Sequence, residues 1–232
     1  MQILFDIGAV VLGYILGSIP FGLLIVKMKT GKDIRTVESG RTGGTNAMRA
    51  AGFGAGLLTA IMDALKGIAA VSAAQALTGN HLVHVFAAAS AIIGHNYSIF
   101  LTERDENGRL RLGGGAGAMP AIGGAIGFWG WSFPIIVGLG ALVFFTVGIA
   151  SLATMTVGMS IIILFTIRAS MGLMPWVDVL YGVIAEVLLI WALRTNIKKL
   201  LTGNERVVSI SLAGQLRIKR EQRKATEPMD DV

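Results

Sequence analysis

The stretch F-G-A-G-L-L-T-A-I-M-D-A-L-K-G-I-A-A-V-S-A-A-Q-A-L-T, residues 53–78, decides the fold class of this chain. It carries only two charged residues, Asp63 and Lys66, and it exceeds the roughly 20 apolar residues that an α-helix needs to cross a bilayer. Six further apolar segments flank it, at about residues 4–26, 82–101, 115–128, 132–149, 155–168 and 176–193. We therefore expect an all-α, polytopic integral membrane protein with about seven transmembrane helices.

The composition indicates the same class. Of the 232 residues, 53% are hydrophobic and 15% are charged, whereas a soluble domain carries about 25% charged residues. The 31 glycines suit close packing of helices in lipid, and residues 123–127 are a candidate contact face. The chain has no cysteine, which excludes disulfides and thiolate chemistry.

Lys and Arg are gathered in three regions of the sequence. Six lie in residues 27–49, three in residues 102–112 and nine from residue 194 onward, together 18 of the 20 in the chain. With seven spans, all three regions fall on one side of the membrane, and the positive-inside rule makes that side the cytoplasm. We expect the N-terminus outside and the C-terminus in the cytoplasm.

Two parts are expected along the chain. Residues 1–200 form a single seven-helix membrane domain, and residues 201–232 form a basic cytosolic C-terminal tail. The net charge of +6 is therefore mostly a signal of membrane topology. The run L-R-I-K-R-E-Q-R-K, residues 216–224, suits solvent or lipid headgroups, so we expect no nucleic-acid partner.

The polar segment E-S-G-R-T-G-G-T-N-A-M-R, residues 38–49, has the features of a phosphate site. Its glycines let the backbone turn N–H groups toward an anion, and its hydroxyls add donors. These residues are Gly40, Gly43, Gly44, Ser39, Thr42 and Thr45. Asn46 is a favourable N-cap for the next helix, and Arg49 opposes the dipole of its first turn, which suggests an anion nearby. The alternative is an ordinary flexible loop between membrane helices.

Two more polar regions lie on the same expected side. The glycine run at residues 113–117 includes Gly114, Gly115 and Gly117, and it precedes a helix that could present amide groups to an anion. A flexible entry into a tightly packed helix would explain the run equally well. Asn196 follows the last span, and its amide could orient a hydroxyl or a phosphate.

Three polar residues fall inside the expected spans. Asp63 and Lys66 share one helix face, and buried charges favour a structural ion pair over a functional cavity. His95 could act as a general base, although a lone membrane histidine more often forms a packing hydrogen bond. The sequence contains no cluster with metal-ligand spacing, so no metal is expected.

Seven motifs follow one another in a recognisable order. They are L-G-S-I-P-F-G-L-L-I (16–25), the 38–49 segment, D-A-L-K-G (63–67), G-H-N-Y-S-I-F (94–100), the 113–117 glycines, S-L-A-T (151–154) and N-I-K-K-L-L-T-G-N-E (196–205). Together they resemble the bacterial acyl-phosphate-dependent glycerol-3-phosphate acyltransferases, the PlsY family, over about residues 8–206.

The resemblance implies a function and a location. The family transfers a fatty acyl group from acyl phosphate to the 1-position of sn-glycerol 3-phosphate. The product is lysophosphatidic acid, and the reaction is the first step of phospholipid synthesis. The family needs neither a cofactor nor a metal. The resemblance also implies a seven-helix protein of the bacterial inner membrane with its active site facing the cytoplasm. Its partners would be the two substrates and membrane lipid, with the soluble enzyme that makes acyl phosphate as a further candidate.

The resemblance assigns roles to particular residues. Ser39, Arg49 and Asn196 match positions expected to act in catalysis, and Thr45, Asn46 and the loop glycines match positions expected to bind phosphate. His95 and Glu205 also match family positions and are supporting candidates. Arg109 and Arg111 are supporting candidates on a different ground, because they add cations to a second loop that is longer than in the family.

The chain departs from the family at cationic positions. Ala116 stands where the glycine loop of the family has lysine, Leu193 stands where the third motif has histidine, and an arginine of the family aligns near Gly148. Either Arg109 and Arg111 replace the lost charge, or the protein is a non-catalytic membrane paralogue that binds lipid or phosphate on the same fold.

Overall fold

The structure is a computed structural model, and it describes residues 1–104 and 106–226. Ten α-helices are described in that part of the chain. They are α1 (Gln2–Ser18), α2 (Phe21–Thr30), α3 (Gly44–Ala51), α4 (Phe53–Leu77), α5 (His81–Asn96), α6 (Ala118–Phe128), α7 (Ser132–Thr146), α8 (Ala150–Ser170), α9 (Trp176–Leu201) and α10 (Leu212–Thr226). Short 3₁₀ turns occupy Ile34–Thr36 and Ile99–Leu101. Strands β1 (Thr102–Arg104) and β2 (Leu110–Leu112) form an antiparallel hairpin.

The helical membrane class is confirmed. Five described helices are long and apolar enough to cross a bilayer: Gln2–Thr30, Phe53–Leu77, His81–Leu101, Ala150–Ser170 and Trp176–Leu201. Helices α6 and α7 are apolar but shorter. The count of seven spans and the division at residue 200 stay predictions.

Small residues let the helices pack with their backbones in contact. A Cβ added to Gly17 in α1 would lie 2.2 Å from the carbonyl oxygen of Ala91 in α5. A Cβ added to Gly123 in α6 would lie 1.9 Å from the carbonyl oxygen of Ala64 in α4. The contact face expected at residues 123–127 is therefore confirmed. Large apolar side chains such as Val187 and Trp191 remain exposed on the outside, where lipid would solvate them.

Several helix boundaries differ from the expectation. The break of the first span around Pro20 is the exception, since a kink is expected there: proline lacks an N–H, and Ile19 before it takes an extended conformation. The gap expected at residues 150–154 is helical, and the break lies earlier, at Gly148 with a φ of 76°. Helix α9 runs on past residue 193 to Leu201.

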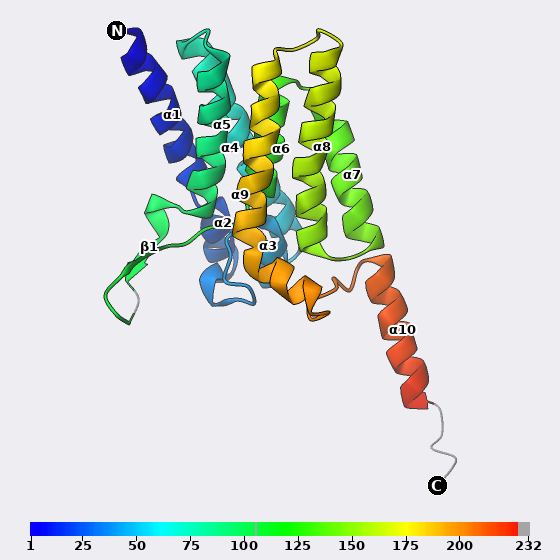
Figure 1. The fold of residues 1–232 in the computed structure, drawn as a ribbon. Coiled ribbons are helices and arrows are strands. Elements are labelled where there is room, and N and C mark those ends of the chain that lie inside the picture. The colour runs from blue at the N-terminus through cyan, green and yellow to red at the C-terminus, as the bar shows by residue number, and fades with distance from the viewer. Residues whose placement is uncertain (105, 227–232) are drawn as a thin grey trace.

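The two ends of the bundle have different characters. Figure 1 shows the N-terminus and the α8–α9 connection at one end, and α3, the hairpin and α10 at the other. The hairpin is fastened to the loop before α3 by an ion pair between Arg35 and Glu103. The end that holds α3 also holds the cavity described next.

Candidate active site

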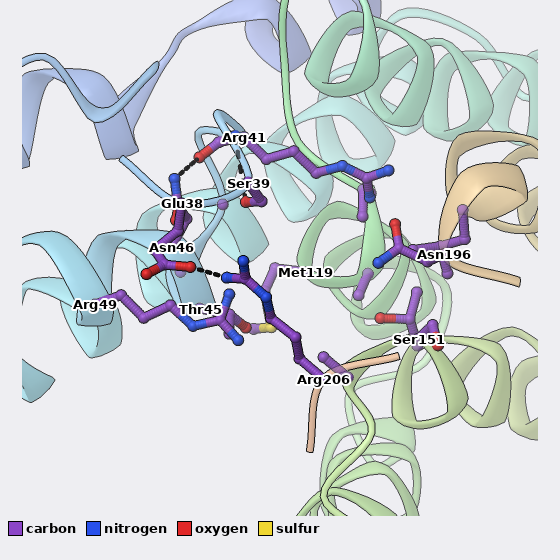
Figure 2. Close-up of a pocket in the computed structure, with 18 of the residues that line it drawn as sticks. Glu38, Ser39, Arg41, Thr45, Asn46, Arg49, Met119, Ser151, Asn196 and Arg206 are labelled. Atoms are coloured by element: carbon purple, nitrogen blue, oxygen red, sulfur yellow. Dashed lines mark hydrogen bonds and ion pairs between the residues drawn. The ribbon is translucent and has the colours of Figure 1, made fainter. Parts of the chain in front are cut away.

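A cavity of about 360 Å³ lies at the end of the bundle where α3, α6 and α8 begin. The cavity is lined by the loop before α3 and α3 itself, by the starts of α6 and α8, and by the end of α9 with the segment that follows. Ala60 and Asp63 of α4 and His95 of α5 also line it. Figure 2 shows side chains from these elements converging on the same space. The loop comes close to the glycine run, because the N–H of Thr42 donates to the carbonyl oxygen of Gly114 at 3.2 Å.

Three helix N-termini meet at this cavity. Its wall includes Gly44 and Thr45 from α3, Ala118 and Met119 from α6, and Ala150 and Ser151 from α8. The first N–H groups of a helix have no partner inside that helix, and the N-terminus carries partial positive charge. Three such ends around one cavity favour an anionic ligand.

Four basic side chains line the cavity, together with the three acidic side chains of Glu38, Asp63 and Glu205. The basic side chains are Arg41, Arg49, Lys199 and Arg206. Arg41 reaches α9, where its Nη2 donates to the carbonyl oxygen of Ala192 at 2.7 Å. Burial lowers the pKa of Arg41 below the usual arginine value, although nearby Glu205 opposes this shift. The side chain still stays charged at neutral pH. Arg49 is exposed, and within the described part of the chain no hydrogen bond or ion pair engages it.

Asn46 has a different position from the one expected. Gly43 is the N-cap of α3, so Asn46 lies inside the first turn and is buried. Its Nδ2 donates to three carbonyl oxygens, those of Ile34 at 3.2 Å, Val37 at 3.0 Å and Arg41 at 2.8 Å. The side chain therefore shapes the loop, and its amide nitrogen is already occupied.

The predicted phosphate-binding glycines divide into two groups. Gly43, Gly44 and Gly117 line the cavity, as does Ala116. Gly40, Gly114 and Gly115 are not among the described lining residues. The N–H of Gly40 donates to the carbonyl oxygen of Val37 at 2.9 Å, and the N–H of Gly115 donates to the carbonyl oxygen of His95 at 2.9 Å. In this structure these two amides hold the loops in shape.

The three residues expected to act in catalysis all line the cavity: Ser39, Arg49 and Asn196. Asn196 is held by a hydrogen bond from its Nδ2 to Glu205 Oε1 at 2.8 Å. Leu193 also lines the cavity, so an apolar surface faces the ligand at that point of α9.

A buried polar triad supports His95. Lys66 Nζ lies 2.9 Å from Asp63 Oδ1 and 2.8 Å from His95 Nδ1, and it donates to the carbonyl oxygen of Ile19 at 3.1 Å. The ion pair is present, but Asp63 and His95 also line the cavity, so the pair is not purely structural. Because an ammonium group only donates, His95 Nδ1 accepts and Nε2 carries the proton. A Cβ on Gly115 would lie 2.0 Å from that Nε2, so the ring directs its N–H toward the glycine run.

Sequence reasoning missed several lining residues. Ser151 is buried, and its Oγ has no hydrogen-bond partner among the described residues, so it remains available to a ligand. The S-L-A-T motif was the one signal for it. Arg41 and Lys199 lie inside the 38–49 and 196–205 motifs but were not singled out there, and Arg206 carries no local pattern that separates it from the other cations of the basic regions.

Arg109 and Arg111 lie on or beside the hairpin strand β2. Neither is among the described residues that line the cavity. The proposal that they replace a lost charge stays a prediction, and the cations that the structure brings to the cavity come from other segments.

Comparison with known proteins identifies the family of this chain. A family model described as glycerol-3-phosphate acyltransferase matches residues 7–203. The chain belongs to this family of acyltransferases. Glycerol-3-phosphate acyltransferase 2 of Moorella thermoacetica is 36% identical over 197 residues, which cover 85% of this chain and 94% of the relative. The glycerol-3-phosphate acyltransferase of Rubrobacter xylanophilus is 35% identical, over 85% of this chain and 92% of the relative.

Two solved structures resemble the fold. The glycerol 3-phosphate form of PlsY, an integral membrane glycerol 3-phosphate acyltransferase, superposes with a TM-score of 0.76 and 29% identity, over 92% of this chain and 98% of PlsY. The lysophosphatidic acid form gives 0.73 and 28%, over 88% and 96%. With these relatives and its apolar helices, the chain is a multi-pass membrane protein.

Proposed function

We propose that this acyltransferase moves a fatty acyl group from acyl phosphate to the 1-hydroxyl of sn-glycerol 3-phosphate, giving lysophosphatidic acid. The observation that carries the proposal is the meeting of three helix N-termini and four basic side chains around one cavity. Both substrates carry phosphate, so the reaction needs a site that neutralises two anions side by side. The relatives, named as glycerol-3-phosphate acyltransferases, support the acceptor.

The acceptor phosphate fits the end of the cavity formed by α3. Arg49 offers a bidentate fork to phosphate oxygens, and Ser39 adds a hydroxyl. The first N–H groups of α3, at Gly44 and Thr45, add backbone donors. Since Arg49 is exposed, it can meet a water-soluble substrate at the mouth of the cavity.

An apolar groove of about 160 Å³ fits the acyl chain of the donor. It shares Gly44 and Thr45 with the cavity, and its other lining residues are almost all apolar, among them Phe53, Leu57 and Phe144. A donor with its phosphate in the cavity would therefore extend its chain between α4 and α7 toward lipid. Burying that chain provides binding energy that grows by about 0.8 kcal/mol per methylene group.

The chemistry needs no covalent intermediate on the protein. The 1-hydroxyl oxygen attacks the carbonyl carbon of acyl phosphate, an ester bond forms, and the bond from that carbon to the phosphate oxygen breaks. The leaving phosphate accepts the hydroxyl proton. The main task of the residues is to hold hydroxyl and carbonyl in register, and the donors around the cavity stabilise negative charge on the carbonyl oxygen.

The same proposal places the cavity at the cytoplasmic face of a bacterial inner membrane. The basic loops and the cavity lie at one end of the bundle, and positive loops stay in the cytoplasm. Glycerol 3-phosphate would enter from that side. A soluble enzyme that makes acyl phosphate could dock on the same basic face.

The test is a transfer assay with purified protein in lipid vesicles and labelled glycerol 3-phosphate. Label should enter lysophosphatidic acid with palmitoyl phosphate and not with palmitoyl-CoA. Arg49→Ala should raise the KM for glycerol 3-phosphate by about tenfold to a hundredfold, because a charged hydrogen bond contributes roughly 1.5–3 kcal/mol. Arg49→Lys should recover only part of this, and Lys29→Ala, an exposed cation away from the cavity, should match the wild type.

The outcomes separate the two candidate functions. Binding of glycerol 3-phosphate without transfer from either donor would contradict the enzyme and leave a phosphate-binding membrane protein on the same fold. Transfer from palmitoyl-CoA alone would contradict the donor.

A further inference from the structure

Residues 204–211 form most of the connection between α9 and α10, and we call them the C-terminal strap. The match to the family model ends at residue 203, so the strap lies outside it. The turn at Gly203, with a φ of 71°, directs the chain from the end of α9 back along the cavity. Asn204, Glu205 and Arg206 all line the cavity wall.

The far end of the strap is anchored on the α7–α8 connection. The N–H of Val208 donates to the carbonyl oxygen of Gly148 at 2.7 Å. Ser211 is fully buried, and its Oγ accepts from the N–H of Gly214 at 3.0 Å where α10 begins. A Cβ on Gly148 would lie 2.0 Å from Ser211 Oγ, so the strap fills the space where a side chain at residue 148 would stand.

The near end is anchored on α9 by the hydrogen bond between Asn196 and Glu205. Arg206 is the next residue, so it is held between two fixed points. Its Nη1 forms an ion pair with Glu38, from the loop before α3. Figure 2 shows the Arg206 side chain directed into the group formed by Glu38, Arg49 and Thr45.

The ion pair leaves Arg206 able to bind a ligand. A guanidinium group has five N–H donors, and one Glu38 oxygen occupies only part of this set. Glu38 itself has a φ of 46°, an unusual conformation for a residue other than glycine. A backbone held in that region is typical of functional sites.

We propose that Arg206 is a substrate-binding residue, which the C-terminal strap carries into the cavity to bind a phosphate group of the substrates. This rests on the proposed function, because that function supplies the two phosphates. The strap thus completes the site from outside the region that the family model describes. Arg206 also supplies a cation to a cavity whose wall has Ala116 at the position where the family has lysine.

The competing explanation is that Arg206 only neutralises Glu38, and one double variant separates the two. Arg206→Ala with Glu38→Gln restores the net charge of the wild-type pair but not the donors. If Arg206 binds a substrate phosphate, Arg206→Ala and the double variant should both weaken the affinity for that substrate by about tenfold to a hundredfold. If it only neutralises Glu38, the double variant should behave as the wild type.

Three further variants extend the test. Gly148→Ala leaves Arg206 intact but places a Cβ against Ser211 at a residue with a φ of 76°, so it should displace the strap together with the α7–α8 connection and weaken binding in the same direction. Arg217→Ala removes an exposed cation of α10 that pairs with Glu221, and it should have no effect. Arg206→Lys keeps the charge without the fork and should recover part of the binding.

The measurements are calorimetric binding of glycerol 3-phosphate in detergent and the KM of each substrate in the transfer assay. A rise in the KM for glycerol 3-phosphate assigns Arg206 to the acceptor phosphate, and a rise for acyl phosphate assigns it to the donor. An active wild type with unchanged constants in Arg206→Ala would overturn this inference alone. An inactive wild type that binds glycerol 3-phosphate through Arg206 would overturn the proposed function and support the inference. No binding and no turnover in the wild type would overturn both.

Discussion

Lys66 is the residue that links the membrane interior to the site. Its ammonium contacts Asp63, His95 and the carbonyl oxygen of Ile19, all inside the bundle. The pair with Asp63 could be predicted, because two opposite charges three residues apart share a helix face. The contact with His95 could not, since it depends on how α4 packs against α5.

Breaking this triad should be costly. Lys66→Met leaves Asp63 buried without its counter-ion, which should lower the free energy of unfolding by about 3–5 kcal/mol. Adding Asp63→Asn removes the stranded charge and should return most of that stability. Activity should stay low in the double variant, because nothing then fixes the proton on His95 Nε2. Thermal unfolding in detergent checks the predicted stability, and the transfer assay checks the predicted activity. Full activity in the double variant would show that the protonation of His95 does not matter for the reaction.

Ala116 offers a gain-of-function test at the same scale. It lines the cavity, so Ala116→Lys would place a new cation among the described lining residues. In the Arg206→Ala background this change should recover at least tenfold of the lost affinity for the affected substrate, because it restores a charged hydrogen bond. Ala116→Gln, of similar size and neutral, should recover little. Equal recovery by lysine and glutamine would show that filling space, and not charge, matters there.

At the scale of elements, the long helices were predictable and the loops were not. Apolar length alone located α4, α5 and α9. The hairpin was missed because β1 and β2 have only three residues each, too few for alternation to stand out. Asn46 was expected at the N-cap, but α3 begins at Gly44 and the side chain turns back into the loop.

The loop before α3 should depend on the donor character of Asn46. Asn46→Asp keeps the shape but removes the N–H groups and sets a carboxylate against three carbonyl oxygens. The free energy of unfolding should fall by about 3 kcal/mol or more, since each buried acceptor without a donor costs roughly 1–3 kcal/mol. Asn80→Asp is the matched control, because Asn80 caps α5 through its oxygen and aspartate does the same. Chemical denaturation should show a large shift for the first variant only.

At the scale of the whole molecule, the site is a meeting of distant segments. Arg41, Ser151 and Arg206 line one cavity although more than 50 residues separate each from the next. No periodicity in the sequence relates such positions, because only the packing of α8 and α9 and the course of the strap bring them together. Basic loops gathered at one end could be predicted, since their positions follow from counting spans.

Orientation can be tested in a chain without cysteine. Gly79→Cys and Leu173→Cys lie in the turns at the end opposite the cavity, and both positions are exposed. They should react with an impermeant thiol reagent in intact cells. Lys32→Cys and Asn107→Cys should react only after the cells are permeabilised. The opposite labelling pattern would show that the topology is inverted and that the cavity faces the outside of the cell.

We propose that the cavity at the basic end binds the acceptor for acyl transfer. An experimental structure of the protein with glycerol 3-phosphate would test this binding site. We expect the phosphate inside the cavity, within about 3 Å of the Arg49 guanidinium and of first-turn N–H groups of α3. Its 1-hydroxyl should point toward the apolar groove that begins at Gly44 and Thr45. A phosphate bound at the other end of the bundle, or on the hairpin away from Arg49, would contradict the account.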